Sequence, residues 1–167
     1  MRTGVRTLLT LLVLALVVVF AGGWGFSMLT APFPKKAAAP VCSSATVDAG
    51  DHVFPAQVTV SVLNASSREG LAGRTMSALK DGGFAPGHSG NAANGTNVRA
   101  VQIWTTDPHN PAVQLVAAWL PGVKIVRHSV AEPGVVVVVG DHFGAVGKGP
   151  KSITATRNAT ICSPTLS

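Results

Sequence analysis

The sequence predicts a small α/β domain built as a two-layer sandwich, with strands and helices in the order β-α-β-β-α-β-β, preceded by one transmembrane helix. Leu8–Leu29 is an apolar segment of 22 residues without a charged side chain. From Gln57 onward, segments of period-two alternation are followed by segments with apolar residues at helical spacing. Val135–Val139 is a run of five valines bounded by glycines, typical of a strand buried on both faces. This order predicts two helices on one face of a sheet, and the nearest general architecture is ferredoxin-like.

Composition limits the class of protein. A chain of 167 residues has room for one small domain. An apolar content of 47% with only 12% charged residues excludes a disordered chain. The net charge is +6, but four of the 13 basic residues flank the apolar segment, so the domain itself is nearly balanced. We therefore expect no nucleic-acid binding, which concentrates basic residues on the folded part.

The apolar segment predicts a membrane anchor at residues 8–29, after a cytoplasmic tail at 1–7. At ~1.5 Å per residue, a helix of this length spans a hydrocarbon core of ~30 Å. Trp24 and Phe26 suit an interfacial aromatic belt near its outer end. The alternative is a cleaved signal peptide, for which Leu8–Phe20 alone is long enough. Arg2 and Arg6 give a slight bias toward a cytoplasmic N-terminus, which predicts a single-pass protein of the cell membrane whose C-terminal domain is extracytoplasmic.

The two cysteines bracket everything that can fold. Cys42 follows the anchor and Cys162 lies near the C-terminus, and neither belongs to a CxxC or zinc-type cluster. In an exported domain, this arrangement predicts one disulfide that clamps the two tails together. Two free thiols are the alternative.

The order of elements follows from the hydrophobic pattern. Residues 30–56 read as an extracytoplasmic linker stiffened by prolines, residues 57–145 as the domain, and residues 146–167 as a C-terminal tail tied back by the disulfide. The period-two strand at 57–63 is expected to be half-buried. Ser66 or Ser67 is expected to cap the first helix. The expected strands are 57–63, a short one from 84, 98–105, 123–126 and 135–139, the expected helices are 68–80 and 111–120, and a weak final strand is expected within 153–161.

Two polar segments are the candidate binding surface. The loop Asn64–Gly70 joins the carboxyl end of a strand to a helix N-terminus, where backbone N–H groups can receive an anion or a carbonyl. The segment His88–Asn97 is rich in Gly and Asn and is expected to be a loop. Simple helix capping is the alternative for the first segment. The candidate contact residues are Asn64, Ser66, Arg68, Arg74, Asn91 and Asn94.

No catalytic set, metal site or cofactor is expected. Asp107, His109, Asp141 and His142 lie in two turns that follow strands and could meet in space as metal ligands or an acid–base pair. Four scattered groups carry little specificity, and turn capping by the aspartates with solvated histidines is the preferred interpretation.

Several short motifs resemble a known family. They are Val60–Ser66, Gly70-Leu71-Ala72 and Gly83-Phe84, with Gly90-Asn91-Ala92 and Val135–Gly140 further along. This pattern resembles the LytR C-terminal domain over about Val58–Phe143, and the combination with one anchor is similar to short actinobacterial proteins of this kind. Asn64, Gly70, Leu71, Ala72 and Gly83 match the family motif and look structural.

The resemblance implies an extracytoplasmic role in cell envelope or wall integrity and implies no catalysis. We therefore expect a non-enzymatic, membrane-anchored domain that binds an envelope protein or a wall glycan. The alternatives are an enzyme, or enzyme accessory, that acts on cell-wall glycopolymers, and a purely mechanical scaffold.

Overall fold

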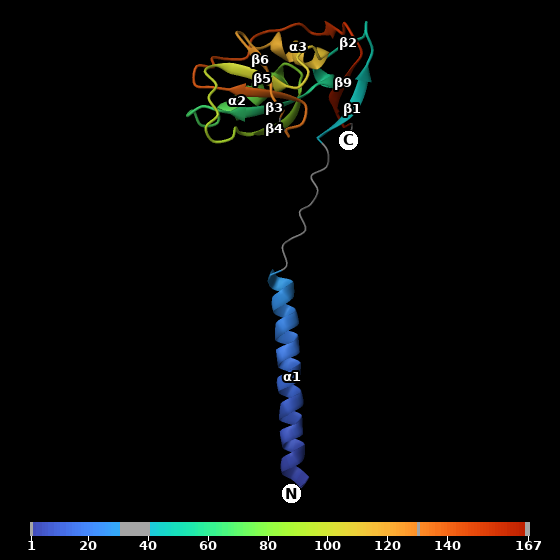
Figure 1. Ribbon diagram of the computed structural model, residues 1–167, viewed down its shortest axis with the longest axis vertical. Helices are drawn as coiled ribbons and strands as arrows, with labels where there is room; N and C mark the ends of the chain where they lie inside the picture. The colour runs from blue at the N-terminus through green and yellow to red at the C-terminus, as the bar shows by residue number, and fades with distance from the viewer. Residues whose placement is uncertain (1, 31–40, 130, 166–167) are drawn as a thin grey trace. The chain divides into compact units, whose positions relative to one another are not determined.

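The protein is described by a computed structural model that covers residues 2–30, 41–129 and 131–165. The chain divides into two units, Met1–Ala37 and Ala38–Ser167. The first contains helix α1, Arg2–Thr30 (Figure 1). Side chains of α1 are described at residues 4 and 9–24, which stops short of both ends of the predicted anchor. Within the residues that the structure describes, no helix has the length and apolarity needed to cross a membrane.

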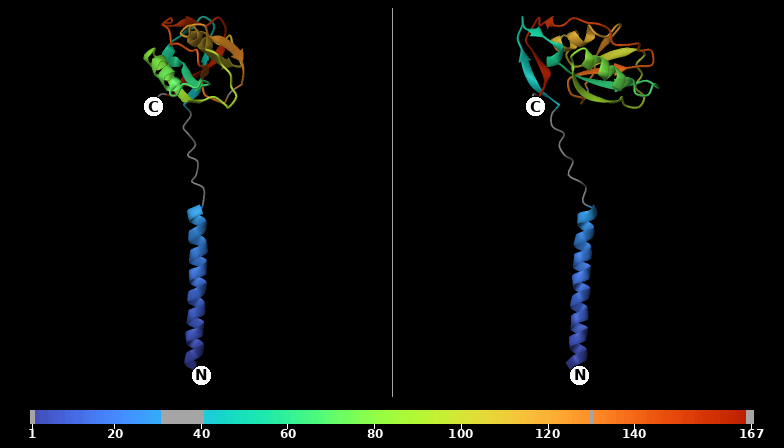
Figure 2. Two further views of the ribbon diagram at one scale, coloured as in Figure 1. Left: turned by 90° about the vertical axis from the view of Figure 1, so that its left-hand side faces the viewer. Right: turned by 180° about the vertical axis from the view of Figure 1, so that it is seen from behind.

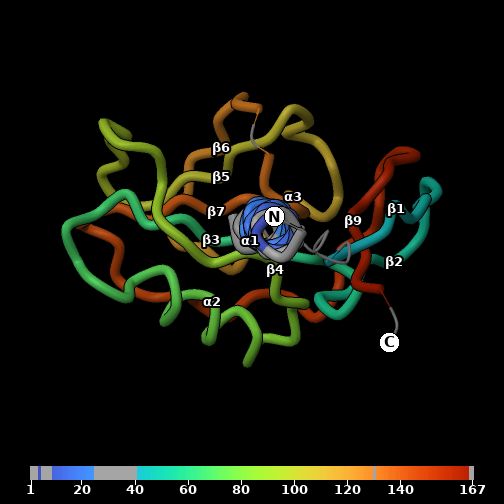
Figure 3. The backbone as a smooth tube through the Cα atoms, turned by 90° about the horizontal axis from the view of Figure 1, so that it is seen from below, coloured from blue at the N-terminus to red at the C-terminus, as the bar shows by residue number. Residues whose placement is uncertain are grey.

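The second unit is built on a five-stranded mixed sheet in the order β4-β3-β7-β5-β6 (Figure 3). Strand β3 pairs in parallel with β4 and β7, β7 pairs antiparallel with β5, and β5 pairs in parallel with β6. The sequence order β3-α2-β4-β5-α3-β6-β7 is the predicted one. The elements are β3 Thr59–Asn64, α2 Leu71–Asp81, β4 Ala85–Asn91, β5 Val101–Thr105, α3 Pro111–Ala117, β6 Lys124–Arg127 and β7 Val135–Val139.

One face of this sheet packs against both helices (Figure 2). Val62, Val137 and Ile103 are cross-strand neighbours on that face and are fully buried. Leu79 of α2 and Leu115 of α3 belong to the same core and have no exposed surface. The two-layer sandwich with two helices on one face is therefore confirmed.

The ferredoxin-like topology is wrong. A split βαβ unit leaves room for another strand between its two strands. Here β3 and β4 are direct neighbours joined by α2, and β5 and β6 are direct neighbours joined by α3. Each βαβ unit is therefore closed, and β7 lies between the two units. All five valines of β7 are buried, as predicted, because this strand is central and covered on both faces.

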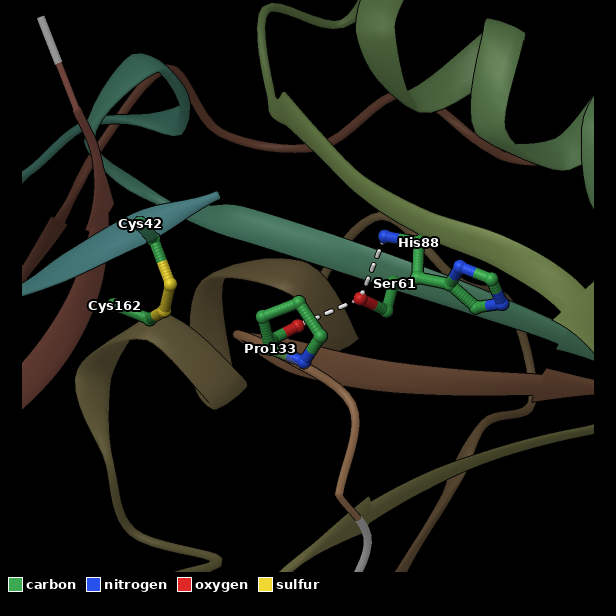
Figure 4. Close-up of a disulfide and its surroundings, with 5 residues drawn as sticks. All are labelled: Cys42, Ser61, His88, Pro133 and Cys162. Atoms are coloured by element: carbon green, nitrogen blue, oxygen red, sulfur yellow. Dashed lines mark hydrogen bonds between the residues drawn. A yellow bond between two sulfur atoms is a disulfide. The ribbon is translucent and has the colours of Figure 1, made fainter. Parts of the chain in front are cut away.

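Strand β3 is buried on both faces, whereas its alternating sequence predicted a half-buried strand. Thr59 and Ser61 have no exposed surface, although they are polar. The Ser61 hydroxyl donates to the Pro133 carbonyl oxygen at 2.6 Å and accepts from the His88 backbone N–H at 3.0 Å (Figure 4). These bonds connect β3 to β4 on one side and to the segment before β7 on the other. A hydroxyl can be buried at this position because both of its partners are supplied.

Residues 42–57 are part of the folded unit, although the sequence assigned 42–56 to the linker. They form β1 (Cys42–Val47), β2 (His52–Val53) and the 3₁₀ helix η1 (Pro55–Gln57). Strand β1 pairs antiparallel with β9 (Ala159–Pro164), and β2 pairs with β8 (Ile153–Thr154). These short, mostly exposed segments give no strand signal, and the residues with which the strands pair lie 100 or more positions away. Residues 31–40 of the predicted linker lie outside the described residues.

The predicted disulfide joins Cys42 to Cys162, with 5.4 Å between the Cα atoms, and there is no free cysteine (Figure 4). It ties the first strand of the folded unit to the last, across a sequence separation of 120 residues. In the chain-entropy treatment, a closed loop of that size stabilises the fold by about 5 kcal/mol. The alternative of two free thiols is therefore wrong.

Helix α2 begins three residues later than predicted, and its N-cap is Gly70 rather than a serine. Gly70 has a φ of 67°, the left-handed region that glycine adopts without steric cost. The predicted capping residues, Ser66 and Ser67, have other hydrogen-bond partners, described below. Leu71, Ala72, Thr75 and Leu79 form one buried face of α2, in agreement with the helical spacing of apolar residues that predicts this helix.

Candidate functional site

The carboxyl ends of three parallel strands meet at one edge of the sheet. Asn64 ends β3 opposite Asn91, which ends β4, and opposite Val139, which ends β7. The segments that follow, residues 65–70, 92–97 and 140–143, therefore emerge side by side. In α/β sheets, ligands bind in the crevice outside the carboxyl ends of parallel strands. This edge is thus the first place to look for a binding site.

Asn64 organises the first of these segments. Its side-chain oxygen accepts from the Ser66 backbone N–H at 3.0 Å and from the Ser66 hydroxyl at 2.7 Å. Its side-chain NH₂ donates to the Arg68 carbonyl oxygen at 2.9 Å. The Ser66 hydroxyl in turn accepts from the Arg68 N–H at 3.1 Å. Asn64 and Ser66 therefore hold residues 65–68 in one shape, and most of their hydrogen-bonding capacity is used for that purpose.

Asp141 holds the same segment from the other side. One of its carboxylate oxygens accepts from the Ser67 N–H at 2.9 Å and from the Ser67 hydroxyl at 2.8 Å. These two bonds lower the pKa of the Asp141 carboxyl below its ordinary value of 3.8, the backbone bond most strongly. Desolvation opposes them to a lesser extent, and the charges of His142 and Arg68 lower the pKa by smaller amounts still. The carboxylate stays ionised at neutral pH and links the segment after β3 to the segment after β7.

A pocket of about 490 Å³ lies between the first two segments. Residues 64–67, 69–70 and 91–96 line it. The side chains of Asn91, Asn94, Thr96 and Glu69 have no hydrogen-bond partner within the described part of the chain. One wall is thus fixed by internal hydrogen bonds, and the other presents unoccupied polar groups.

Four of the six predicted contact residues line this pocket, namely Asn64, Ser66, Asn91 and Asn94. The two predicted segments therefore come together, although the second is partly a strand. Residues 88–91 belong to β4, although a loop was expected there because the segment lacks an apolar pattern. Glu69 and Thr96 were not singled out, and their only sequence signal is that they lie inside the two segments.

The two predicted arginines lie elsewhere. Arg68 and Arg74 line a separate depression of about 170 Å³ between α2 and residues 143–146. The Arg68 guanidinium donates to the carbonyl oxygens of Phe143, at 2.7 Å, and Asp141, at 3.3 Å. Its positive charge is directed toward the segment after β7 and away from the larger pocket.

The residues considered for catalysis do not meet. Asp107 and His109 follow β5, whereas Asp141 and His142 follow β7, and these two strands are antiparallel. The two pairs therefore lie at opposite edges of the sheet. Asp107 forms an ion pair with Arg157 and accepts from the His109 backbone N–H. Among the described residues, no group of three or more His, Cys, Asp or Glu side chains could hold a metal ion.

Fold and pocket together define a small α/β domain with a mostly uncharged polar pocket at one edge of its sheet. The chain belongs to the LytR_C family, described as LytR cell envelope-related transcriptional attenuator, whose model matches residues 57–143. That match covers about half of the chain, includes both walls of the pocket, and confirms the resemblance seen in the sequence.

A similar solved structure is the soluble domain of a conserved hypothetical secreted protein from Mycobacterium marinum. It is 28% identical, with a TM-score of 0.49, over 60% of this chain and 77% of that chain. Among curated proteins, none matches this chain.

Proposed function

We propose that this protein is a membrane-anchored, extracytoplasmic domain that supports the integrity of the bacterial cell envelope by binding an envelope protein or a wall glycan. The observation that carries the proposal is the pocket at the carboxyl ends of β3 and β4. It unites the two polar segments within a domain whose family is cell envelope-related. We propose binding rather than catalysis.

The anchor is proposed from the sequence. Thr7–Pro34 contains no charged side chain, and Leu8–Leu29 has 22 residues. The described large apolar side chains of α1, from Leu9 to Trp24, are about half or more exposed in the chain by itself. A lipid bilayer is the solvent that such a surface favours.

The extracytoplasmic location is supported by the disulfide between Cys42 and Cys162. Disulfides form and persist in oxidising compartments and are rare in the cytoplasm. Because Cys42 closely follows the proposed anchor, the whole domain would lie on the side of the membrane where this bond forms.

Binding is favoured over catalysis by the chemistry of the edge. Asp141 is the carboxylate nearest to a hydroxyl nucleophile, but it accepts two hydrogen bonds from Ser67 and has a lowered pKa. A general base works best when its pKa is near the operating pH. Asp141 is therefore suited to holding a loop and poorly suited to removing a proton.

The proposal is tested by replacing Asn91 and Asn94 with alanine in the chromosomal gene. Both side chains line the pocket and have no partner to lose within the described residues, so the fold should be unaffected. We expect increased sensitivity of the cells to detergent and wall-active antibiotics at unchanged protein level. The matched control is Asn97→Ala, an exposed asparagine in the same segment that does not line the pocket. Equal behaviour of the double variant, the control and the wild type would refute the proposal.

A further inference from the structure

Charge distinguishes the pocket from the rest of the edge. Glu69 is the only ionisable side chain among its lining residues. Arg68, its neighbour in the sequence, is held by the carbonyl oxygens of Phe143 and Asp141, and Arg74 lines the separate depression. Asp141, held by Ser67, adds a second negative charge behind the wall. The Arg74 guanidinium borders the other side of Gly70, because a Cβ on that residue would stand 3.2 Å from its Nη1. The two arginines thus offset the two carboxylates, so the surroundings of the pocket carry no net charge. An uncharged ligand matches such surroundings, because it gains or loses little by entering them.

The unoccupied polar groups describe the ligand further. The side-chain amides of Asn91 and Asn94 each offer donors and acceptors, and the Thr96 hydroxyl offers both as well. None of the three has a partner within the described residues. Asn91 and Asn94 are exposed and Thr96 is half-buried, so water can satisfy all three in the free protein. A ligand that displaces this water needs donors and acceptors close together, as hydroxyl and acetamido groups provide.

The volume and the lining residues of the pocket favour a glycan over a protein as its ligand. A volume of about 490 Å³ is in the range of small-molecule sites, about 300–1,000 Å³. Protein partners are anchored mainly by Trp, Tyr and Arg side chains in well-packed interfaces. The lining contains no aromatic residue and no arginine; its apolar contribution comes from Ala65, Ala92 and Ala93.

We infer that the pocket binds an uncharged glycan that carries acetamido groups, that is, a chain of N-acetylated amino sugars. The inference rests on the proposed function and chooses among its partners. Asn91 and Asn94 contact the ligand directly, whereas Asn64 is a positioning residue that shapes the wall through Ser66. Glu69 is the one charged side chain of the lining.

The test is an NMR titration of the full-length chain in detergent micelles with a tetramer of N-acetylglucosamine. Matched titrations use maltotetraose, pentaglycine and polyphosphate, which separate acetamido recognition from hydroxyl, peptide and anion recognition. We expect the acetylated tetramer to bind most tightly and its affinity to stay within about twofold between about 50 and 500 mM salt, since a neutral ligand is not screened. Asn91→Ala with Asn94→Ala should weaken binding about tenfold or more, because each lost hydrogen bond accounts for about two- to tenfold. Asn97→Ala should change it less than twofold.

Three results would overturn the inference. One is tighter binding of polyphosphate or pentaglycine than of the acetylated tetramer. Another is affinity that falls steeply with salt. The third is no binding of any glycan, or binding that the double variant leaves unchanged while its thermal unfolding matches that of the wild type. If the double variant also impairs the envelope in cells while no glycan binds, the proposed function stands with a protein partner and only this inference fails.

Discussion

Replacing Ser61 with alanine tests whether its two hydrogen bonds stabilise the buried strand β3. The Ser61 hydroxyl is buried and joins the Pro133 carbonyl oxygen to the His88 N–H. Alanine would leave both backbone groups without this partner. An unsatisfied buried group costs about 1–3 kcal/mol, and partial access of water to these two keeps the total near the lower end, at about 2 kcal/mol. For a domain of this size, that corresponds to a fall in Tm of about 8 °C.

Thr59→Val is the matched control, on the same face of the same strand. The Thr59 hydroxyl is also fully buried but has no partner among the described residues. Valine has the same shape as threonine and is also β-branched, but it lacks the hydroxyl, whose burial without a hydrogen bond is unfavourable. We expect an unchanged or slightly raised Tm.

Thermal and urea unfolding of the full-length chain in detergent, followed by tryptophan fluorescence, compares the two variants. Trp104 and Trp119 report on the folded unit. The reasoning is refuted if Ser61→Ala is as stable as the wild type, or if Thr59→Val destabilises as much as Ser61→Ala. In either case the two hydrogen bonds would not be what makes the buried hydroxyl tolerable.

Further predictions concern the disulfide, one carboxylate and one glycine. Replacing both disulfide cysteines with serine should lower the free energy of unfolding, measured in urea, by up to about 5 kcal/mol. Reductant should not destabilise this variant further, and a further loss of stability in reductant would contradict the Cys42–Cys162 disulfide. Asp141 has a lowered pKa in the folded state, so its stabilising effect is complete above the ordinary value of 3.8 and disappears as the pH falls through the lower folded value. When the pH is lowered from above 3.8 to below the folded pKa, the free energy of unfolding should therefore fall less in Asp141→Asn than in the wild type. Equal pH profiles of the two proteins would show that the ionised carboxylate does not stabilise the fold through Ser67. Gly149→Ala would bring its Cβ into a clash with Cδ1, Nε1 and Cγ of the Trp119 indole and should cost about 1–3 kcal/mol in thermal unfolding. Gly144→Ala meets open space and should be neutral, and equal effects of the two substitutions would contradict the packing.

The sequence predicted the elements whose signal is local. The valines of β7 and the apolar stripe of α2 identify buried elements because their period and composition are visible within a few residues. The polar sequence of β4, APGHSGN, has no such period. It becomes a strand because β3 offers it a parallel partner, and tertiary pairing of this kind overrides local preference.

Topology and the direction of side chains were harder to predict. Nothing local decides whether the strands of a βαβ unit lie next to each other or apart, so the placement of β7 between β3 and β5 needs the whole sheet. The two segments that form the pocket were predicted as contact surface. The first was chosen because it lies between a strand and a helix N-terminus, and the second because it is polar and rich in Gly and Asn. The arginines were misplaced because the guanidinium of Arg68 turns toward carbonyl oxygens after β7, which lie 73 and 75 residues away in the sequence.

Site-specific photo-crosslinking in living cells tests the central claim most directly. One photoreactive residue replaces Asn94, which lines the pocket. The other replaces Lys80 in the last turn of α2, at the opposite end of this helix from the pocket. The account predicts that Asn94 forms a crosslink to a cell-envelope component from the outer side of the membrane and that Lys80 does not. Crosslinking from Asn94 to cytoplasmic components, or equal crosslinking from both positions, would contradict it.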